Sequence, residues 1–274
     1  MKKILILVSL FTALFATAQT QDTLYVWKAG VLVNIQSIKT ADMDSITFQR
    51  PNTSGINIAG PNVTDIDGNT YQSVTKCGQT WTKQNLNVSK YSDGTPIPQV
   101  QDPTAWNNLT TGAWCYYNNY PANGPIYGKL YNWYAVAGIY DAASQANPAL
   151  RKKLAPTGWH IPTDPEWTQL TDCLGGQVVA GGKMKSTGTL QSGTGLWESP
   201  NTDATNESGF TGLPAGYRYF YGPFNAIGSD GVWWSSSENN TSDAWYRFLN
   251  YNDGYAYRDK HYKTHGFSVR CVKD

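Results

Sequence analysis

The chain has 274 residues, of which 15% are charged and 14% aromatic, including 11 Trp and 18 Tyr, and its formal net charge is +1. Lysines and arginines are scattered among acidic residues, so the basic patch or stripe that a nucleic-acid-binding domain requires is missing from the sequence. We therefore expect no nucleic-acid partner. Many aromatic and few charged side chains suit an extracellular domain that forms hydrogen bonds through neutral groups.

Residues 1–18 have the features of a secretory signal peptide. Lys2 and Lys3 precede an apolar run over residues 4–15, and Ala16-Thr17-Ala18 supplies a small-residue cleavage site. The mature protein is expected to begin near Gln19, with a formal net charge of about −1 once the two lysines are removed. No later segment reaches the roughly 18 apolar residues of a membrane helix. The sequence therefore predicts an exported protein (secreted, periplasmic or on the cell surface) without a transmembrane segment in the mature chain.

Residues 19–50 are predicted to form a small N-terminal β unit. Two short strands, Leu24–Trp27 and Val31–Ile35, flank a turn at Lys28–Gly30, and Ile46–Phe48 supplies a further strand. Residues 51–62, rich in Pro, Asn and Gly, have the composition of a linker. Residues 63–274 have one uniform composition and a length that a single domain can accommodate.

The first half of this domain has two clear secondary-structure patterns. Short strands are predicted at 71–74 and 81–86, on either side of a turn at Cys77-Gly78. Residues 130–137 are predicted to form a short buried helix that Gly138 ends.

A second helix is predicted to begin at Thr163. Thr163 and Glu166 have the spacing of a capping box, apolar residues recur at helical spacing over 167–174, and Gly175-Gly176 ends the pattern. Beyond it, Gly181-Gly182 is taken as part of a loop.

The end of the chain is predicted to be β-structure. Asn252-Asp-Gly254 lies between two strand-like runs, which indicates a hairpin. Residues 267–272 alternate as a half-buried strand does.

Residues 238–265 form the most distinctive segment. Half of this window is Asn, Tyr, Asp or His, side chains that combine a small or flat body with a hydrogen-bonding tip and that are common at recognition surfaces. We expect these residues to face solvent and to contact a ligand, with tyrosines and one tryptophan as anchors. The predicted ligand-binding residues are Asn239, Asn240, Asp243, Trp245, Tyr246, Asn250, Tyr251, Asn252, Asp253, Tyr255, Tyr257, Asp259, His261, Tyr262 and His265.

The aromatic residues divide into two groups. Tyrosines in a loop-like polar context are expected to be exposed, which adds Tyr219 and Tyr221 to the candidates above. Tryptophans with apolar neighbours are expected to fill the core: Trp81, Trp133, Trp159, Trp167, Trp233 and Trp234.

Catalytic and metal-binding patterns were weighed against structural interpretations. Asp65, Asp67 and Asn69 resemble the start of a calcium loop, but Lys76 stands where the distal Glu belongs, so a turn is favoured. His160 has apolar neighbours, which favours a hydrogen-bonded structural role. His261 and His265 lack the helical context of a zinc pair. We expect no metal, no cofactor and no catalytic residue.

Four cysteines, Cys77, Cys115, Cys173 and Cys271, are expected to be paired in an exported protein. Four cysteines allow three pairings, and the residues do not choose between them.

Seven motifs, spaced in order over residues 63–274, resemble the Fibrobacter succinogenes major paralogous domain. They are Thr64-Asp-Ile-Asp-Gly-Asn-Thr-Tyr71, Gly78-Gln-Thr-Trp81 with Asn85-Leu86, Tyr127-Gly-Lys-Leu-Tyr-Asn-Trp-Tyr134, Pro156-Thr-Gly-Trp-His-Ile-Pro-Thr163 with Glu166-Trp167, Asn206-Glu-Ser-Gly-Phe210, Trp233–Glu238 and Val269-Arg-Cys271.

This resemblance implies an α+β, C-type-lectin-like fold, similar to that of formylglycine-generating-enzyme relatives. Such a domain has two helices, small twisted antiparallel sheets and long ordered loops. It further implies a disulfide from the helix to the last strand, Cys173–Cys271, and with it Cys77–Cys115. The formylglycine-generating relatives use two cysteines near the end of the domain, whereas here Cys271 has no second thiol near it in the sequence, so that oxidation chemistry is not expected.

The segment 238–265 also resembles the variable region of proteins diversified by retroelements. In those proteins, adenine-directed mutation of Asn codons produces Asn, Tyr, Asp, His and Ser. The sequence therefore predicts an exported, non-catalytic binding module for a protein or glycan ligand. The alternatives are a structural component of the cell surface or envelope and, less favoured, a carbohydrate-active or formylglycine-generating-like enzyme. The sequence does not determine the oligomeric state.

Overall fold

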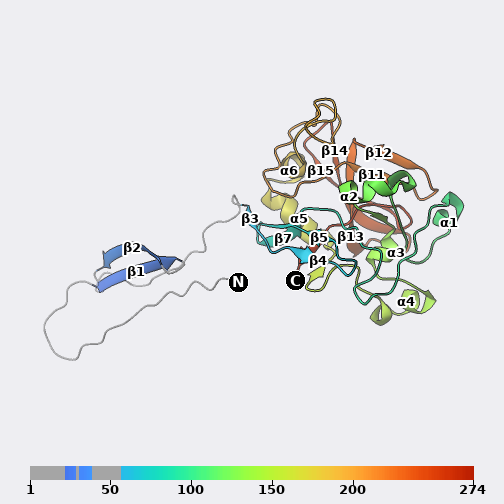
Figure 1. Ribbon diagram of the computed structural model, residues 1–274, viewed down its shortest axis with the longest axis horizontal. Coiled ribbons are helices and arrows are strands. Elements are labelled where there is room, and N and C mark those ends of the chain that lie inside the picture. Colours follow the sequence, from blue (N-terminus) through green and yellow to red (C-terminus); the bar gives the residue numbers. More distant parts are fainter. Residues whose placement is uncertain (1–21, 29–30, 39–56) are drawn as a thin grey trace. The chain divides into compact units, whose positions relative to one another are not determined.

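A computed structural model describes residues 22–28, 31–38 and 57–274 (Figure 1). The chain divides into two compact units, 1–51 and 52–274. In the first unit, β1 (Asp22–Lys28) pairs antiparallel with β2 (Val31–Ile38), with a register shift between Val26 and Trp27. This pairing confirms the first two predicted strands. The predicted signal peptide, the strand at 46–48 and linker residues 51–56 lie outside the described residues.

The second unit contains a five-stranded sheet of very short strands. Its order is β10-β16-β7-β6-β3, and neighbouring strands are antiparallel. Strands flank the Cys77-Gly78 turn on both sides, as predicted, but they lie closer to it than the predicted ranges 71–74 and 81–86. The five strands are β3 (Ile58–Ala59), β6 (Ser73–Lys76), β7 (Gln79–Thr82), β10 (Trp159–His160) and β16 (Val272–Lys273).

A second five-stranded sheet, which we call the C-terminal sheet, has longer strands. Its order is β12-β11-β13-β14-β15, and it is antiparallel except where β11 meets β13 at Gly216 and Gly231. The hairpin predicted at 252–254 is confirmed by β14 and β15. The strands are β11 (Ala215–Arg218), β12 (Phe224–Ile227), β13 (Asp230–Glu238), β14 (Asp243–Asn250) and β15 (Ala256–Tyr262).

Two small ribbons complete the β-structure: β4 (Val63–Thr64) pairs with β5 (Thr70–Tyr71), and β8 (Trp114–Cys115) pairs with β9 (Leu130–Tyr131). The turn between β4 and β5 contains the aspartates that resemble a calcium loop. There the Asp65 carboxylate accepts hydrogen bonds from the backbone N–H groups of Asp67 and Asn69 and from the Tyr71 hydroxyl. The carboxylate oxygens are engaged within the turn, as the turn interpretation requires.

The predicted second helix is α5 (Asp164–Cys173). Its capping box is present, because the Thr163 side chain accepts from the Glu166 N–H while the Glu166 carboxylate accepts from the Thr163 N–H. The predicted first helix is shorter than expected: α3 (Trp133–Val136) begins after Asn132, because Leu130 and Tyr131 pair with β8. The other short helices are α1 (Pro103–Asn107), α2 (Gly124–Tyr127), α4 (Ala142–Ala146) and the 3-10 turns η3 (Tyr117–Asn119), η4 (Pro121–Asn123) and η5 (Pro148–Leu150).

Helix α6 (Gln177–Met184) was not predicted, because its Gly181-Gly182 pair indicated a loop. In the folded chain both glycines face close backbone neighbours. A Cβ at Gly181 would lie 1.9 Å from the Tyr255 carbonyl oxygen, and one at Gly182 would lie 2.4 Å from that of Asp203. Gly181 therefore lets the helix approach the β14–β15 turn and Gly182 lets it approach Asp203, and this packing outweighs their poor helix propensity.

The tryptophans assigned to the core are buried, as predicted. Each of the six is at most 5% exposed, and three of them, Trp81, Trp167 and Trp233, pack with Phe210 at ring-centroid distances between 5.4 and 5.9 Å. These aromatic contacts lie between the two five-stranded sheets and α5, α6, where large ring areas leave water.

The prediction of a half-buried strand over residues 267–272 is wrong, because this segment is buried at every position. Hydrogen bonds to other parts of the domain satisfy its buried arginine. Arg270 is fully buried and donates to the Asn85 side chain and to backbone carbonyls, among them those of Thr82 and Phe210. Alternation in this segment thus reflects buried hydrogen bonding rather than a solvent-exposed face.

The disulfide pairing implied by the family resemblance is wrong. Cys77 is bonded to Cys173, with a Cα–Cα distance of 6.0 Å, and Cys115 and Cys271 are buried free thiols. The end of α5 lies against the Cys77 turn, where the Gln169 amide donates to the Cys77 carbonyl. Cys271 belongs instead to the interior segment, in the hydrophobic core.

The second unit is thus an α+β domain with few helices and several small, mainly antiparallel sheets, as the sequence predicts. No helix among residues 22–28, 31–38 and 57–274 is long and apolar enough to cross a membrane.

Candidate functional site

The segment predicted to bind a ligand is mostly β14 and β15, and the two faces of these strands differ. Side chains alternate between the faces of a strand, so Trp245, Arg247 and Leu249 point to one side while Tyr246 and Phe248 point to the other. Cross-strand partners share a face, and the pairs Arg247–Arg258 and Phe248–Tyr257 extend this division to β15. We call the first side the helix face and the second the cavity face.

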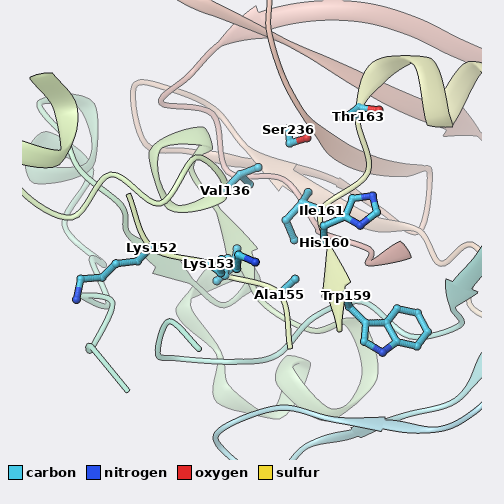
Figure 2. A pocket seen from close by; sticks show the side chains of 10 residues that line it. Val136, Lys152, Lys153, Ala155, Trp159, His160, Ile161, Thr163 and Ser236 are labelled. Atoms are coloured by element: carbon cyan, nitrogen blue, oxygen red, sulfur yellow. The ribbon is translucent and has the colours of Figure 1, made fainter. Parts of the chain in front are cut away.

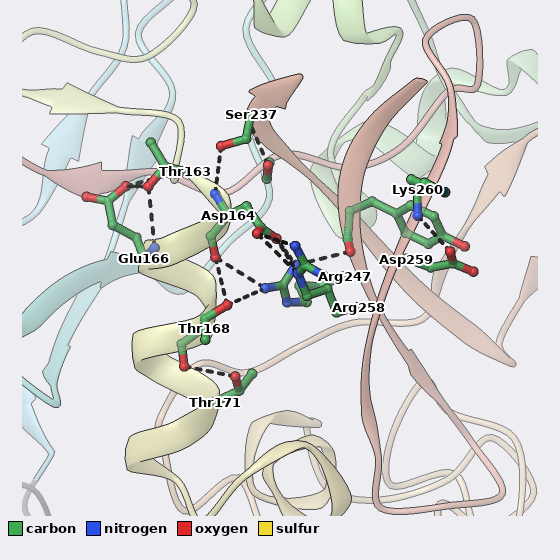
Figure 3. Close-up of polar contacts among 12 residues, drawn as sticks. Thr163, Asp164, Glu166, Thr168, Thr171, Ser237, Arg247, Arg258, Asp259 and Lys260 are labelled. Carbon is green, nitrogen blue, oxygen red and sulfur yellow. Dashed lines mark hydrogen bonds and ion pairs between the residues drawn. The ribbon is translucent and has the colours of Figure 1, made fainter. Parts of the chain in front are cut away.

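The helix face is joined to α5 by an ion-pair network (Figure 3). The Asp164 carboxylate accepts from Arg247 Nη1 at 2.7 Å and from Arg258 Nη2 at 2.8 Å. Burial would raise the pKa of Asp164, but the hydrogen bonds from the two guanidinium groups outweigh it and hold the pKa below its usual value. Arg258 also lies over the Trp245 ring, 3.6 Å from its centroid. Trp245, predicted as a ligand anchor, is therefore occupied by this contact.

The cavity face has a hollow of about 220 Å³, which we call the aromatic cavity. It is formed by β11, β13, β14, β15 and the segment that follows β15. Its nine lining residues are Tyr217, Tyr219, Asp230, Val232, Tyr246, Phe248, His261, His265 and Phe267.

Aromatic rings in different planes enclose this cavity. Tyr217 is close to perpendicular to both Tyr219 and Phe267, with interplanar angles of 83° and 86°. Tyr246 is roughly parallel to Phe248, at 27°, and tilted by 46° to Phe267. The rings therefore surround the space from several directions rather than covering it as one flat platform.

Asp230 is the acidic residue of the aromatic cavity. Its carboxylate accepts a hydrogen bond of 2.5 Å from the Asn250 amide, and within residues 57–274 no lysine or arginine forms an ion pair with it. Burial raises the pKa of Asp230 to about 6, and the nearby acids Asp253 and Glu198 act in the same direction against the Asn250 hydrogen bond. The predicted residue Asn250 thus contributes by holding Asp230.

The rings of His261 and His265 are in contact at one edge of the cavity, with centroids 3.6 Å apart and planes tilted by 37°. Burial, and then the neighbouring His261, lower the pKa of His265 to about 3, and burial also lowers the pKa of His261. Both rings are therefore neutral near pH 7. His265 and Tyr246 were expected at the surface but are 0% and 9% exposed, because their rings form the wall and floor of the cavity.

A second hollow of about 350 Å³ adjoins the histidine edge. Phe220 and Tyr262 line it, and the Phe220 ring also packs against His265 at 5.5 Å and Tyr262 at 5.0 Å. Tyr262 is 47% exposed, as predicted. The contact between Phe220 and His265 therefore lies between the two hollows.

The remaining predicted residues lie in turns or outside the cavity. Asn240 accepts from the backbone N–H groups of Ser242 and Asp243 and so stabilises the β13–β14 turn, to which Asn239 also belongs. Asp259 and Tyr255 are exposed, and Tyr257 stacks on Phe248 at 4.3 Å.

The β14–β15 turn, with Asn252 and Asp253, is held from inside by Lys185. This ammonium is fully buried and donates to the carbonyls of Thr202, Asn250 and Asp253 at 2.7 to 2.9 Å. Tyr251 packs against the core beside it. These turn residues are thus fixed by the interior of the domain.

A separate, mainly apolar hollow of about 240 Å³ contains His160 at its edge (Figure 2). Both ring nitrogens of His160 are engaged, by Asp274 at 2.7 Å and by Glu166 at 2.8 Å. Burial would lower the pKa of His160, but the hydrogen bonds that its ring donates to the Asp274 and Glu166 carboxylates outweigh this and raise the pKa. The predicted hydrogen bonding of this histidine is confirmed, and no nitrogen of the ring is left to act on a ligand.

No group of three or more His, Cys, Asp or Glu side chains in the part of the chain that the structure describes is placed to hold a metal ion. Among the three hollows described above, the aromatic cavity combines aromatic walls with an acidic group.

Sequence reasoning missed five residues of the aromatic cavity: Tyr217, Asp230, Val232, Phe248 and Phe267. A usable signal was present, since Tyr246, Phe248 and Asn250 alternate along one strand with Arg247 and Leu249. That alternation would have separated the two faces, although it could not have placed β11 beside them.

Residues 74–273 match the family described as the Fibrobacter succinogenes major domain. The chain matches no curated protein and no solved structure. The matched region spans more than half of the chain and includes the whole C-terminal sheet, together with α5 and α6. The protein therefore belongs to the Fibrobacter succinogenes major domain family.

Proposed function

We propose that this protein is an exported, non-catalytic binding module that recognises its ligand, a protein or a glycan outside the cell, through the cavity face of the C-terminal sheet. The observation that carries the proposal is the aromatic cavity itself, a hollow in which several rings and one carboxylate converge. Concave sites with aromatic walls and a few placed polar groups are typical of ligand binding.

The two faces of the sheet support this assignment. On the helix face the polar groups of Asp164, Arg247 and Arg258 satisfy one another. On the cavity face the Asp230 carboxylate has no cationic partner in residues 57–274, and buried His265 Nε2 has no hydrogen-bond partner there. A buried polar atom without a partner costs free energy in a folded protein, so the retention of the His265 nitrogen beside a hollow favours a binding role.

The scaffold completes the proposal. We infer a C-type-lectin-like arrangement, in which short sheets and ordered loops hold a C-terminal face rigid. The Cys77–Cys173 disulfide and the buried Lys185 ammonium immobilise the elements behind that face. A rigid site loses little conformational entropy on binding.

A glycan array and a binding screen against surface proteins, both with the mature protein, test this function. Each ligand found would be measured again with Phe248→Leu, which removes a cavity ring, and with Tyr255→Ala, which removes an exposed ring outside the cavity. We expect the first variant to lose binding and the second to keep it. Equal binding by both variants, with both folded, would place the site elsewhere.

A further inference from the structure

The charge of the aromatic cavity identifies the kind of group that it suits. Asp230 is its only acidic lining residue, and the nearby carboxylates of Asp253 and Glu198 add negative potential. The two histidines add no positive charge near pH 7, because the pKa of each lies below its usual value. The cavity therefore carries uncompensated negative charge when Asp230 is ionised.

The aromatic rings, like the carboxylate, favour a cation in the cavity. The face of an aromatic ring is the negative end of its quadrupole and attracts a cation placed within about 6 Å. The Tyr217 ring stands nearly at right angles to the rings of Tyr219 and Phe267. A group inside the cavity would thus meet rings from more than one side.

Elsewhere this domain fills comparable sites with its own cations. Lys129 lies over Trp114, Arg258 over Trp245 and Arg270 over Phe210, at 4.4, 3.6 and 4.3 Å from the ring centroids. None of the cation–ring pairs within residues 57–274 uses a ring of the aromatic cavity. The carboxylate and rings of the cavity are therefore free of any lysine or arginine from the described part of the chain.

Size limits the occupant further. About 220 Å³ is less than the volume of most sites for drug-sized molecules, roughly 300–1,000 Å³. The space suits one small head group, while the rest of a larger ligand would lie outside, toward the adjoining hollow at Tyr262.

From these contacts we infer that the aromatic cavity binds a small organic ammonium group, with Asp230 as its counter-ion and the rings of Tyr217, Tyr246, Phe248 and Phe267 around it. This inference rests on the proposed function and names the chemistry of the group recognised. The ammonium could be alkylated, as in a trimethylammonium head group, or primary, as in an amino sugar.

Protein-detected NMR titrations of the mature protein test the inference. The probes are tetramethylammonium, glucosamine and glucose. Their binding is monitored through the NMR signals of the Asn250 side-chain amide and of the cavity rings. We expect at least one of the two ammonium compounds to bind, and glucose, which is neutral, to bind about tenfold more weakly or not at all. Binding of tetramethylammonium alone identifies an alkylated head group, and binding of glucosamine alone identifies a primary ammonium.

Two pairs of variants locate the site. Asp230→Asn should weaken binding of the ammonium probe by about tenfold or more. Asp172→Asn, the same change at an exposed position of α5, should leave this binding unchanged. Phe248→Leu should weaken binding of the probe severalfold, and Phe248→Tyr, which keeps a ring, should bind it as the wild type does. The NMR spectrum of each variant reports whether it is folded.

The inference is overturned if glucose binds as tightly as glucosamine and tetramethylammonium does not bind, or if Asp230→Asn binds the ammonium probe as well as the wild type does. A neutral ligand that still needs Phe248 would overturn the ammonium chemistry but leave the proposed function intact. Ligand binding that is lost in variants outside the cavity but kept in Phe248→Leu would overturn both the ammonium inference and the proposed function.

Discussion

Two partly buried carboxylates lie at opposite faces of the C-terminal sheet and have different partners: Asp164 of α5 at the helix face and Asp230 of β13 at the cavity face. Asp164 on the helix face is held by Arg247 and Arg258, and its pKa lies below the usual value. Asp230 on the cavity face has only the Asn250 amide, and its pKa is raised to about 6. The first carboxylate fastens the sheet to α5. The second remains available, which is the arrangement expected where a ligand supplies the missing charge.

Removing the first carboxylate should have the largest effect on stability. Asp164→Ala leaves the buried Arg247 guanidinium without its partner, so we expect a loss of about 3–5 kcal/mol in the free energy of unfolding. Asp172→Ala, an exposed change on the same helix, should alter it by less than about 0.5 kcal/mol. Denaturant unfolding measures both. Similar values for the two variants would show that the network does not anchor the helix face.

Removing the Cys77–Cys173 disulfide should have the second largest effect on stability. The double variant Cys77→Ser, Cys173→Ser opens a loop with a sequence separation of 96 and should lose about 2–4 kcal/mol. A reducing agent should destabilise the wild type similarly and leave the double variant unchanged. If reduction destabilised the double variant as well, another pair of thiols would have to be bonded.

On the cavity face, removing the carboxylate charge is expected to stabilise the protein rather than destabilise it. Because the pKa of Asp230 is higher in the folded than in the unfolded chain, its ionisation opposes folding, and this cost is present above about pH 6 and vanishes below about pH 4. Since the side chain is partly exposed, Asp230→Asn should stabilise the protein by only about 1–2 kcal/mol near pH 7.

The difference between this variant and the wild type, measured by urea unfolding across the pH range, isolates Asp230. His261, His265, Glu198 and Asp253 are common to both proteins, so their titration largely cancels. A destabilised Asp230→Asn at neutral pH would contradict this account, because Asp230 would then have a favourable partner within the fold.

The smallest effect is expected outside the cavity. Tyr255 is 38% exposed and does not line the aromatic cavity, so Tyr255→Ala should change stability by less than about 0.5 kcal/mol and leave ammonium binding unchanged. Thermal unfolding and the NMR titration measure the two quantities. Loss of binding would extend the contact surface to the β14–β15 turn.

Local patterns in the sequence determined much of this domain. The capping box at Thr163 and the Asn-Asp-Gly turn at 252–254 depend on neighbouring residues, and the structure has both α5 and the β14–β15 hairpin. The tryptophans of the core were also predictable, because apolar ring area must leave water wherever the chain folds. These elements agree with the α+β class that the family resemblance implied.

Only the tertiary structure decided which residues meet. Helix α6 forms despite two glycines because backbone from the β14–β15 turn packs closely on Gly181 and that of Asp203 on Gly182. Cys173 reaches Cys77 because α5 ends beside the Cys77-Gly78 turn. The aromatic cavity likewise combines β11 with β13, β14 and β15, which bring Tyr217 and Asp230 to Tyr246. Such contacts join residues far apart in the chain, so periodicity and spacing fix the faces of each strand but not its neighbours.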